Sequence, residues 1–253
     1  MIDVHCHLEQ KDYDKDRDEV IEKCKKELKA VITSCAQPKD FELTMQIAEK
    51  YKNFVFACCG IHPEYIKEVS EREIEETIEK IKQNKEKIVA IGECGMDKFW
   101  IHEVDWQNKQ KELFIKFILI AKKLNKPIVV HSRNAYSEII EILEQENAQN
   151  VLLHLWSDKK LISKIIENDW FISVGPILLK SKTHKKIIRD MPLERIMTET
   201  DSPWFGIEKK RGIPNNVKFV IQKISEIKKI NIEDVDRITT QNAMKFFKIP
   251  III

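Results

Sequence analysis

Short apolar runs recur along this chain, separated by longer amphipathic stretches, and this rhythm is its most constraining feature. Eight runs have the composition and length of β-strands: 1–5, 30–35, 54–60, 88–93, 127–132, 151–156, 170–175 and 195–200. Their apolar character is continuous rather than alternating, which is typical of strands covered on both faces. The pattern therefore predicts a parallel sheet with helices on its outside.

The stretches between the runs place apolar residues at helical spacing, as Val20, Ile21 and Cys24 do in 17–28. The predicted helices are 17–28, 71–86, 107–124, 135–146, 158–167 and 178–190, with 215–228 and 232–247 closing the chain. Eight strands alternating with helices over 253 residues predict an α/β fold, a (β/α)8 TIM barrel with extra C-terminal helices. A doubly wound sheet is the alternative, but no GxGxxG follows the first strand. Without a linker or repeat, we expect one domain over 1–253.

Composition excludes several classes of protein. With 43% hydrophobic and 33% charged residues the chain is too apolar for disorder, and no apolar run is long enough to span a bilayer. A formal charge of +2 gives no global field for a polyanion, so contact with nucleic acid must be local. The six cysteines form no CxxC pair, and the N-terminus lacks a signal-peptide pattern. We expect reduced thiols in a cytoplasmic protein, with no membrane contact and no stable protein partner implied.

Ionisable residues cluster at the C-terminal ends of the predicted strands. Five of the seven histidines lie there, as do one Glu and one Asp: His5, His7, His62, His131, His154, Glu93 and Asp201. In a parallel barrel the loops that build the active site converge at this end. The two remaining histidines, His102 and His184, receive no predicted role.

The spacing of His5 and His7 points to a metal site. Residues i and i+2 of a strand project to the same side, so both imidazoles can reach one ion. Burying acids such as Glu93 without a cation is costly, and a metal removes that cost for acids and histidines together. Cys94 and the Cys58–Cys59 pair lie near these residues, and we interpret them as small buried apolar residues rather than ligands.

Six segments in order resemble the TatD-related metal-dependent DNase family, within the wider group of amidohydrolase-type barrels. They are DVHCHL (3–8), GIHP (60–63), IGECGMD (91–97), PIVVHSRNA (127–135), LLHLWS (152–157) and ETDSPW (199–204). The resemblance implies a two-metal centre: His5, His7 and Asp201 on one ion, His131 and His154 on the other, and Glu93 bridging both. It also implies that His62 stands near the substrate phosphate.

Two positions depart from the family pattern. Asp158 stands where a Gly is common, and Lys98–Phe99 replace the usual aromatic pair. Both lie in loops at the barrel mouth, so they bear on substrate preference and leave the metal ligands untouched.

The expected chemistry is hydrolysis by two divalent ions, which activate a shared water and clamp an in-line displacement. The mixed nitrogen and carboxylate ligands are compatible with zinc, manganese or magnesium and do not choose between them. We predict that Asp201 orients the attacking hydroxide or accepts its proton. His62 and Arg133 would neutralise the phosphoryl oxygens, although Arg133 is equally suited to a salt bridge with a neighbouring loop.

Weaker features indicate nucleic acid as the substrate. Trp100, Trp156 and Trp204 follow strand ends, where bases could stack on them or where they could simply fill the barrel mouth. Basic runs at 159–160, 180–182 and 209–211 would add a local phosphate track.

The predicted function is therefore a metal-dependent deoxyribonuclease, with 3′–5′ exonuclease action as one form. An amidase or esterase, including an aminoacyl-tRNA deacylase, is the alternative, since the same hydroxide attacks carbonyls. A catalytically silent binding protein is a third interpretation, which the intact ligand set opposes.

Overall fold

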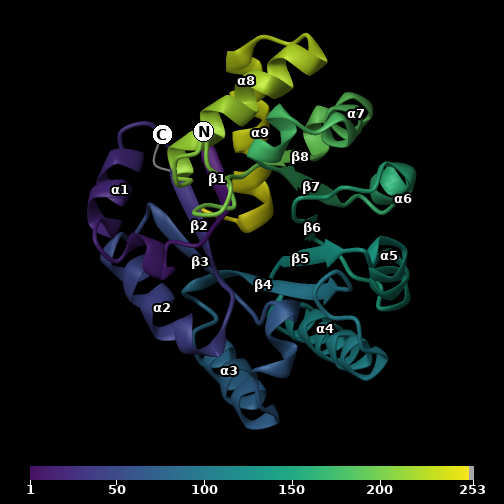
Figure 1. Cartoon of the computed structure of the whole chain (residues 1–253). Coiled ribbons are helices and arrows are strands. Elements are labelled where there is room, and N and C mark those ends of the chain that lie inside the picture. Colours follow the sequence, from purple (N-terminus) through teal and green to yellow (C-terminus); the bar gives the residue numbers. More distant parts are fainter. Residues whose placement is uncertain (251–253) are drawn as a thin grey trace.

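The computed structural model describes residues 1–250, in which eight parallel strands form one sheet that curls into a barrel with helices outside it (Figure 1). The strands pair in chain order, each with the next. They are β1 (Ile2–Cys6), β2 (Ala30–Cys35), β3 (Val55–Cys59), β4 (Ile88–Asp97), β5 (Ile128–Arg133), β6 (Val151–Leu153), β7 (Phe171–Val174) and β8 (Ile196–Thr198). The circle is completed beyond β8, where the Asp201 amide donates to the His5 carbonyl (2.8 Å) and the His7 amide to the Ser202 carbonyl (2.8 Å). The predicted (β/α)8 barrel is confirmed.

Helices alternate with the strands, and two follow β8 as predicted. They are α1 (Arg17–Cys24), α2 (Phe41–Lys50), α3 (Glu71–Gln83), α4 (Val104–Leu124), α5 (Tyr136–Gln145), α6 (Ile162–Glu167), α7 (Lys182–Asp190), α8 (Val217–Lys228) and α9 (Ile232–Phe247). The sequence pattern did not predict α2. Only Phe41, Thr44 and Ile47 are buried on that helix, and the central Thr interrupts its apolar face.

Strand β4 is longer than the predicted 88–93 because glycine lets it run close to β5. Gly95 has φ +144°, and a Cβ there would lie 2.0 Å from the His131 carbonyl oxygen. The segment from Cys94 to Asp97 therefore pairs with β5. As a result, β4 carries both Glu93 and Asp97 into the barrel mouth.

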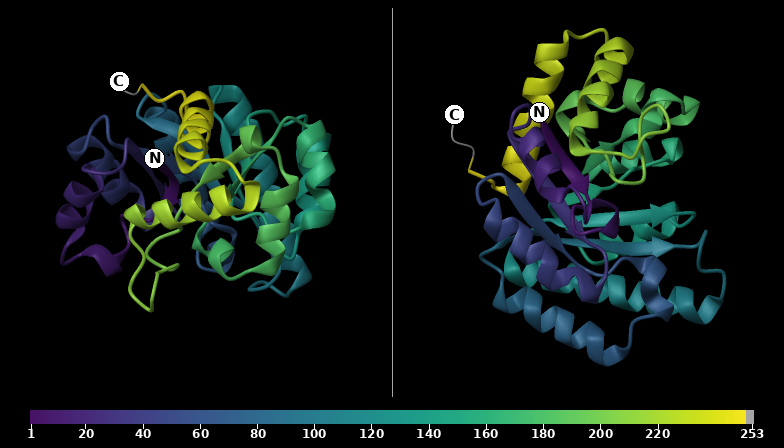
Figure 2. Two further views of the ribbon diagram at one scale, coloured as in Figure 1. Left: turned by 90° about the horizontal axis from the view of Figure 1, so that it is seen from above. Right: turned by 60° about the vertical axis from the view of Figure 1, so that its left-hand side comes forward.

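Helix α9 lies next to β1 and β8 and fills the N-terminal end of the barrel (Figures 1 and 2). Its Ala243, Phe246 and Phe247 share one apolar cluster with the first residues of the strands. Asn242 fastens the helix by donating to the Leu193 carbonyl (3.0 Å) and the Ile196 carbonyl (2.8 Å). The opposite end, where the strands finish, is left for a functional site.

All six cysteines are free thiols and are buried, as the composition predicted. Within residues 1–250, none of the helices combines the length and apolar composition that crossing a bilayer requires.

Candidate metal centre

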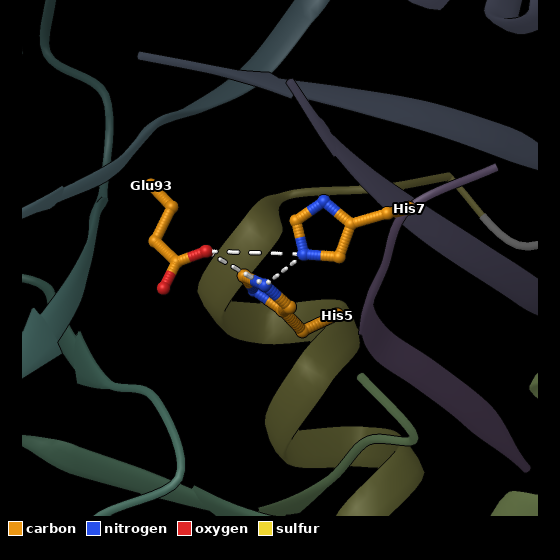
Figure 3. A group of neighbouring side chains, drawn as sticks. All are labelled: His5, His7 and Glu93. Carbon is orange, nitrogen blue, oxygen red and sulfur yellow. Dashed lines mark hydrogen bonds and ion pairs between the residues drawn. The ribbon is translucent and has the colours of Figure 1, made fainter. Parts of the chain in front are cut away.

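Three side chains from β1 and β4 meet at the C-terminal end of the barrel. Figure 3 shows the imidazoles of His5 and His7 facing the carboxylate of Glu93. His5 Nε2 lies 3.1 Å from His7 Nε2 and 3.1 Å from Glu93 Oε2. Asp201 Oδ1 joins this group 3.3 Å from His7 Nε2. All four side chains are buried.

A second group surrounds the other oxygen of the same carboxylate. Glu93 Oε1 lies 2.9 Å from His131 Nδ1, 3.5 Å from His62 Nε2 and 3.6 Å from His154 Nε2. Glu93 therefore faces His5 and His7 with one oxygen and the remaining histidines with the other. The six residues that the sequence proposed as ligands are thus brought together, and their binding of metal remains a prediction.

The backbone has positive φ at Gly92, directly before Glu93, and at Asp201. Gly92, before Glu93, has φ +145°, and a Cβ there would lie 2.5 Å from the Val129 carbonyl oxygen. Asp201 has φ +51°, in the left-handed region that Asp tolerates better than most residues. Local strain of this kind persists where packing over-determines it, and it concentrates at functional sites.

Each of the four expected ligand histidines has a second partner on the ring nitrogen that faces away from the cluster. His5 Nδ1 contacts Ser34 Oγ (3.2 Å) and His7 Nδ1 contacts Glu9 Oε1 (3.2 Å). The other two rings behave alike: His131 Nε2 meets Asp97 Oδ2 (2.9 Å), and His154 Nδ1 meets Glu199 Oε2 (2.8 Å). Metal-ligating histidines are characteristically oriented in this way, through a hydrogen bond from the other nitrogen.

Sequence reasoning assigned no role to these four orienting residues. Asp97 and Glu199 lie in segments that carried the family resemblance, so their presence there was a usable signal. Glu9 and Ser34 gave none, because only the tertiary contact between β1, β2 and the loop after β1 brings them to the histidines.

The site concentrates negative charge that the described protein does not neutralise with basic side chains. Five carboxyl groups around the site are buried: Glu9, Glu93, Asp97, Glu199 and Asp201. No Lys or Arg is buried anywhere in residues 1–250. Burial of unpaired carboxylates is strongly unfavourable, so cationic histidines or bound metal ions must compensate.

The pKa directions show how the protein balances this charge without a metal. Burial opposes ionisation of Glu93, yet the surrounding histidines hold the pKa of Glu93 well below its ordinary value. Burial also opposes protonation of His154, but Glu199 and Glu93 raise the pKa of His154 to about 10. Bound metal ions would replace the protons of the cationic histidines as the positive charge that balances the buried carboxylates.

The donor set fits divalent ions. Two ligand atoms about 2.0–2.1 Å from a tetrahedral ion lie about 3.3 Å apart. The separations between ligand atoms around Glu93 fall near that value, from 2.9 to 3.9 Å. His131 and Glu93 form a potential metal-holding group with His62, while His5 and His7 form another with Glu93. No such group in the described chain includes a cysteine.

His62 lies closer to the cluster than sequence reasoning placed it. Its Nε2 is 3.1 Å from His131 Nδ1, while its Nδ1 accepts the Glu64 amide (3.1 Å). Because Nδ1 is an acceptor, the proton of the neutral ring sits on Nε2 and points into the site. Burial and the neighbouring His131 lower the pKa of His62 to about 3, so this ring is a neutral donor.

Arg133 lies at the end of β5 and lines the same cavity. Its guanidinium stacks on Phe99, 3.7 Å from the ring centroid, with Trp100 at 5.5 Å. Within the described chain it has no carboxylate partner, so the alternative of a salt bridge to a neighbouring loop is wrong. Its edge is free to bind an anion.

The three tryptophans divide into two kinds. Trp100 and Trp204 are 52% and 53% exposed and line the cavity, with the Trp204 ring 4.4 Å from that of His7. Trp156 is 1% exposed, and its Nε1 donates to the Asp158 carbonyl (2.7 Å). The prediction that Trp156 stacks on a base is therefore wrong, because its ring packs edge-on against Tyr136 inside the protein.

Two of the basic runs at the mouth are partly neutralised. Lys159 pairs with Asp190 (3.0 Å), and Arg211 pairs with Asp16 (2.6 Å). The cavity at the metal centre has a volume of about 480 Å³, and Arg133 is the only Lys or Arg among the described residues that line it. This volume lies in the range of small-molecule sites.

Comparison with known protein families gives a match over nearly the whole chain. The family described as TatD related DNase matches residues 2–248. The chain is 34% identical over 258 residues to human deoxyribonuclease TATDN3, covering 98% of this chain and 94% of that protein. It is 37% identical over 249 residues to an uncharacterized metal-dependent hydrolase of Methanocaldococcus jannaschii, covering 98% and 96%.

A solved structure shows the same fold. The Escherichia coli protein YJJV, described as a TatD homolog, superimposes with a TM-score of 0.91 at 21% sequence identity, covering 99% of this chain and 98% of that one.

Proposed function

This chain belongs to the TatD-related DNase family, and on that premise we propose that it is a metal-dependent hydrolase that cleaves phosphodiester bonds of DNA. The observation that carries the proposal is the position of Glu93, whose two oxygens face two separate groups of histidines. The proposed ligands are His5, His7 and Asp201 for one ion and His131 and His154 for the other, with Glu93 between them. Zinc, manganese and magnesium are the candidate metals.

The ions would supply a water of lowered pKa and positive charge for the oxygens of the reacting phosphate. The protein's own part begins with Asp201. Its Oδ1 lies 3.3 Å from His7 Nε2 and its Oδ2 lies 4.0 Å from His154 Nε2, so the carboxylate reaches both groups. Burial opposes ionisation, but His7 and His154 keep the pKa of Asp201 below its ordinary value. An ionised Asp201 can therefore orient the attacking water and accept its proton.

His62 and Arg133 are proposed to bind the phosphoryl oxygens. The neutral Nε2–H of His62 lies 3.5 Å from Glu93 Oε1, beside the proposed metal ligands. Arg133 offers the planar edge of its guanidinium, which is stacked on the Phe99 ring. Donors fixed in advance at the place where charge develops stabilise a transition state without reorganisation.

DNA as the substrate is supported by the similarity to human deoxyribonuclease TATDN3 and by the exposed rings of Trp100 and Trp204 at the mouth. Base stacking on an exposed aromatic ring contributes about 1–3 kcal/mol. We further propose that residues 1–253 act as one catalytic domain. The six free, buried thiols support a cytoplasmic location.

The test uses protein stripped of metal by a chelator and then restored with zinc, manganese or magnesium separately. Each form is incubated with end-labelled single-stranded and double-stranded DNA, RNA, and a panel of amide and ester substrates. We expect metal-dependent cleavage of DNA. Cleavage of carbonyl substrates without phosphodiester cleavage would overturn the proposal in favour of an amidase or esterase.

A substitution tests the role of Asp201. Asp201→Asn is expected to abolish hydrolysis while the far-UV and near-UV circular dichroism stay unchanged. The matched control is Asp105→Asn, in an exposed position on α4. Near-wild-type turnover by Asp201→Asn would exclude Asp201 from the reaction.

A further inference from the structure

One side of the barrel mouth carries lysines that have no acidic partner. Residues 170–189 contain no Asp or Glu, and four lysines stand among them: Lys180, Lys182, Lys185 and Lys186. We call these four residues the α7 lysines. Three of them are exposed, and Lys185 is partly buried. Within residues 1–250 none of the four forms an ion pair, so their charge is available to a partner from outside the chain.

The α7 lysines adjoin the cavity at the metal centre. The short helix η5 (Pro176–Leu179) comes directly before Lys180, and α7 begins two residues after it. Each of these helices contributes a side chain to the wall of the cavity, Ile177 from η5 and His184 from α7. A polymer that leaves the cavity over η5 and the first turns of α7 therefore passes within reach of the lysines.

The α7 lysines lie where a helix by itself disfavours positive charge. Lys182 is the first residue of α7, Ser181 caps the helix, and the first turn holds no acidic residue. The helix dipole makes this end positive, so Asp or Glu would stabilise it and Lys does not. Lys182 and Lys186 are also four residues apart, which brings two like charges together on the helix surface. An anionic partner would relieve both of these unfavourable effects.

The opposite side of the mouth has the reverse charge. Helix α3 follows β3 and α7 follows β7, so the two helices lie four strands apart around the eight-stranded barrel (Figure 1). Glu64 lines the cavity on the α3 side, and Glu68 and Glu71 follow it at exposed positions. Within the described chain none of these three carboxylates has a Lys or Arg partner. A polyanion is therefore repelled from the α3 side and attracted to the α7 side.

We propose that the α7 lysines bind the phosphates of a single DNA strand whose scissile phosphate lies at the metal centre. The strand leaves the cavity over α7 and not over α3. This inference rests on the proposed deoxyribonuclease function and adds the direction of the strand and the residues that hold it. A DNA backbone fits the α7 lysines because its charge recurs along the strand, and ammonium groups on flexible stems bind such charges without reading the bases.

The experiment measures how kcat/KM depends on salt concentration in the presence of the activating metal. One substrate is a dinucleotide, whose single phosphodiester would be held at the metal centre and would not reach α7. The other is a single-stranded oligonucleotide of about 15 nucleotides, long enough to extend over α7. For a single strand, each phosphate contact contributes about 0.7 to the slope of log kcat/KM against log salt. We expect the wild-type slope to be steeper on the oligonucleotide.

The decisive variant is Lys180→Gln/Lys182→Gln/Lys186→Gln. Loss of three phosphate contacts is expected to flatten its slope on the oligonucleotide by about 2 and to leave the slope on the dinucleotide unchanged. Replacement of the same three lysines by arginine retains the charge and is expected to retain the wild-type slope. The dinucleotide is the internal check on folding, because its cleavage needs an intact metal centre and no contact with α7.

The matched control is Lys23→Gln/Lys26→Gln/Lys29→Gln. It removes the same three charges from exposed positions shortly before β2, at the end of the barrel opposite to the mouth. This control is expected to keep the wild-type slope on the oligonucleotide. Equal flattening by the control and the α7 variant would mean that only the total charge matters, which overturns the inference.

The remaining outcomes separate this inference from the proposed function. A wild-type slope that is the same on both substrates, or an unchanged slope in the α7 variant, would overturn the inference. Equal losses of the α7 variant on both substrates would overturn it too, since the substitutions would then act on the metal centre. Each of these results leaves the deoxyribonuclease function standing. No cleavage of DNA with any of the metals would overturn the proposed function, and the inference with it.

Discussion

Glu199 contacts the ring of His154 and is expected to control which ring nitrogen of His154 carries a proton. Glu199 Oε2 accepts from His154 Nδ1 (2.8 Å), while Oε1 accepts the Leu155 amide (3.1 Å). In Glu199→Gln, the amide oxygen keeps the bond to Leu155, so the NH2 group faces His154 Nδ1 as a donor. His154 must then accept at Nδ1 and carry its proton on Nε2. That nitrogen faces Glu93 and can no longer bind a metal.

The magnitude follows from the loss of an orienting partner. Substitution of such a residue typically costs about 10–100-fold in metal affinity, or about 1.4–2.7 kcal/mol. Only the ion held by His131 and His154 is expected to weaken. His5 and His7 depend on Ser34 and Glu9 instead.

The assay titrates chelator-stripped protein with zinc and measures the heat of binding by isothermal titration calorimetry. We expect two equivalents to bind to the wild-type protein. In Glu199→Gln one of these affinities should fall while the other stays. Glu194→Gln, an exposed position shortly before β8, is the matched control. Two unchanged affinities in Glu199→Gln would refute the reasoning, since the tautomer of His154 would then be irrelevant to binding.

Three further predictions concern stability. Gly92→Ala places a Cβ 2.5 Å from the Val129 carbonyl oxygen and should lower the free energy of unfolding by about 1–3 kcal/mol, measured by urea denaturation; an unchanged value would contradict the close approach. Trp156→Ala should lower the free energy of unfolding by about 3–5 kcal/mol, whereas Trp100→Ala should change it by no more than about 0.5 kcal/mol and raise the KM for DNA. A larger loss of stability in Trp100→Ala than in Trp156→Ala would contradict the assignment of Trp156 to the core and Trp100 to the substrate. Because Glu199 and Glu93 raise the pKa of His154 from its ordinary 6.5 to about 10, protonation stabilises the metal-free fold fully below pH 6.5. That stabilisation should disappear as the pH rises towards 10, and a urea midpoint that does not fall over this window would contradict the assignment.

The barrel itself was predictable from local patterns. Strand β2 has the predicted bounds, Ala30–Cys35, because a short run rich in small and β-branched residues between polar segments needs no tertiary information to be recognised. Helix α2 was missed because its buried face carries Thr44, whose hydroxyl bonds to the Asp40 carbonyl (2.9 Å) inside the helix turn. The C-terminal half of β4 was missed because glycines there serve close strand packing rather than an apolar pattern.

The sequence alone determined where the reactive side chains would gather. His5, His131 and Asp201 each stand at or just beyond a strand end, and parallel strands of a barrel deliver such residues to one mouth by topology. This conclusion needs only chain order and strand direction, which the apolar runs encode.

Only the tertiary structure decided what surrounds those side chains. The pairing of His154 with Glu199 and the burial of Trp156 depend on how neighbouring elements pack and rotate. Residues far apart in the chain meet there at distances set to a few tenths of an ångström by close packing. No local pattern carries that information, because the contact exists only once both elements have been placed.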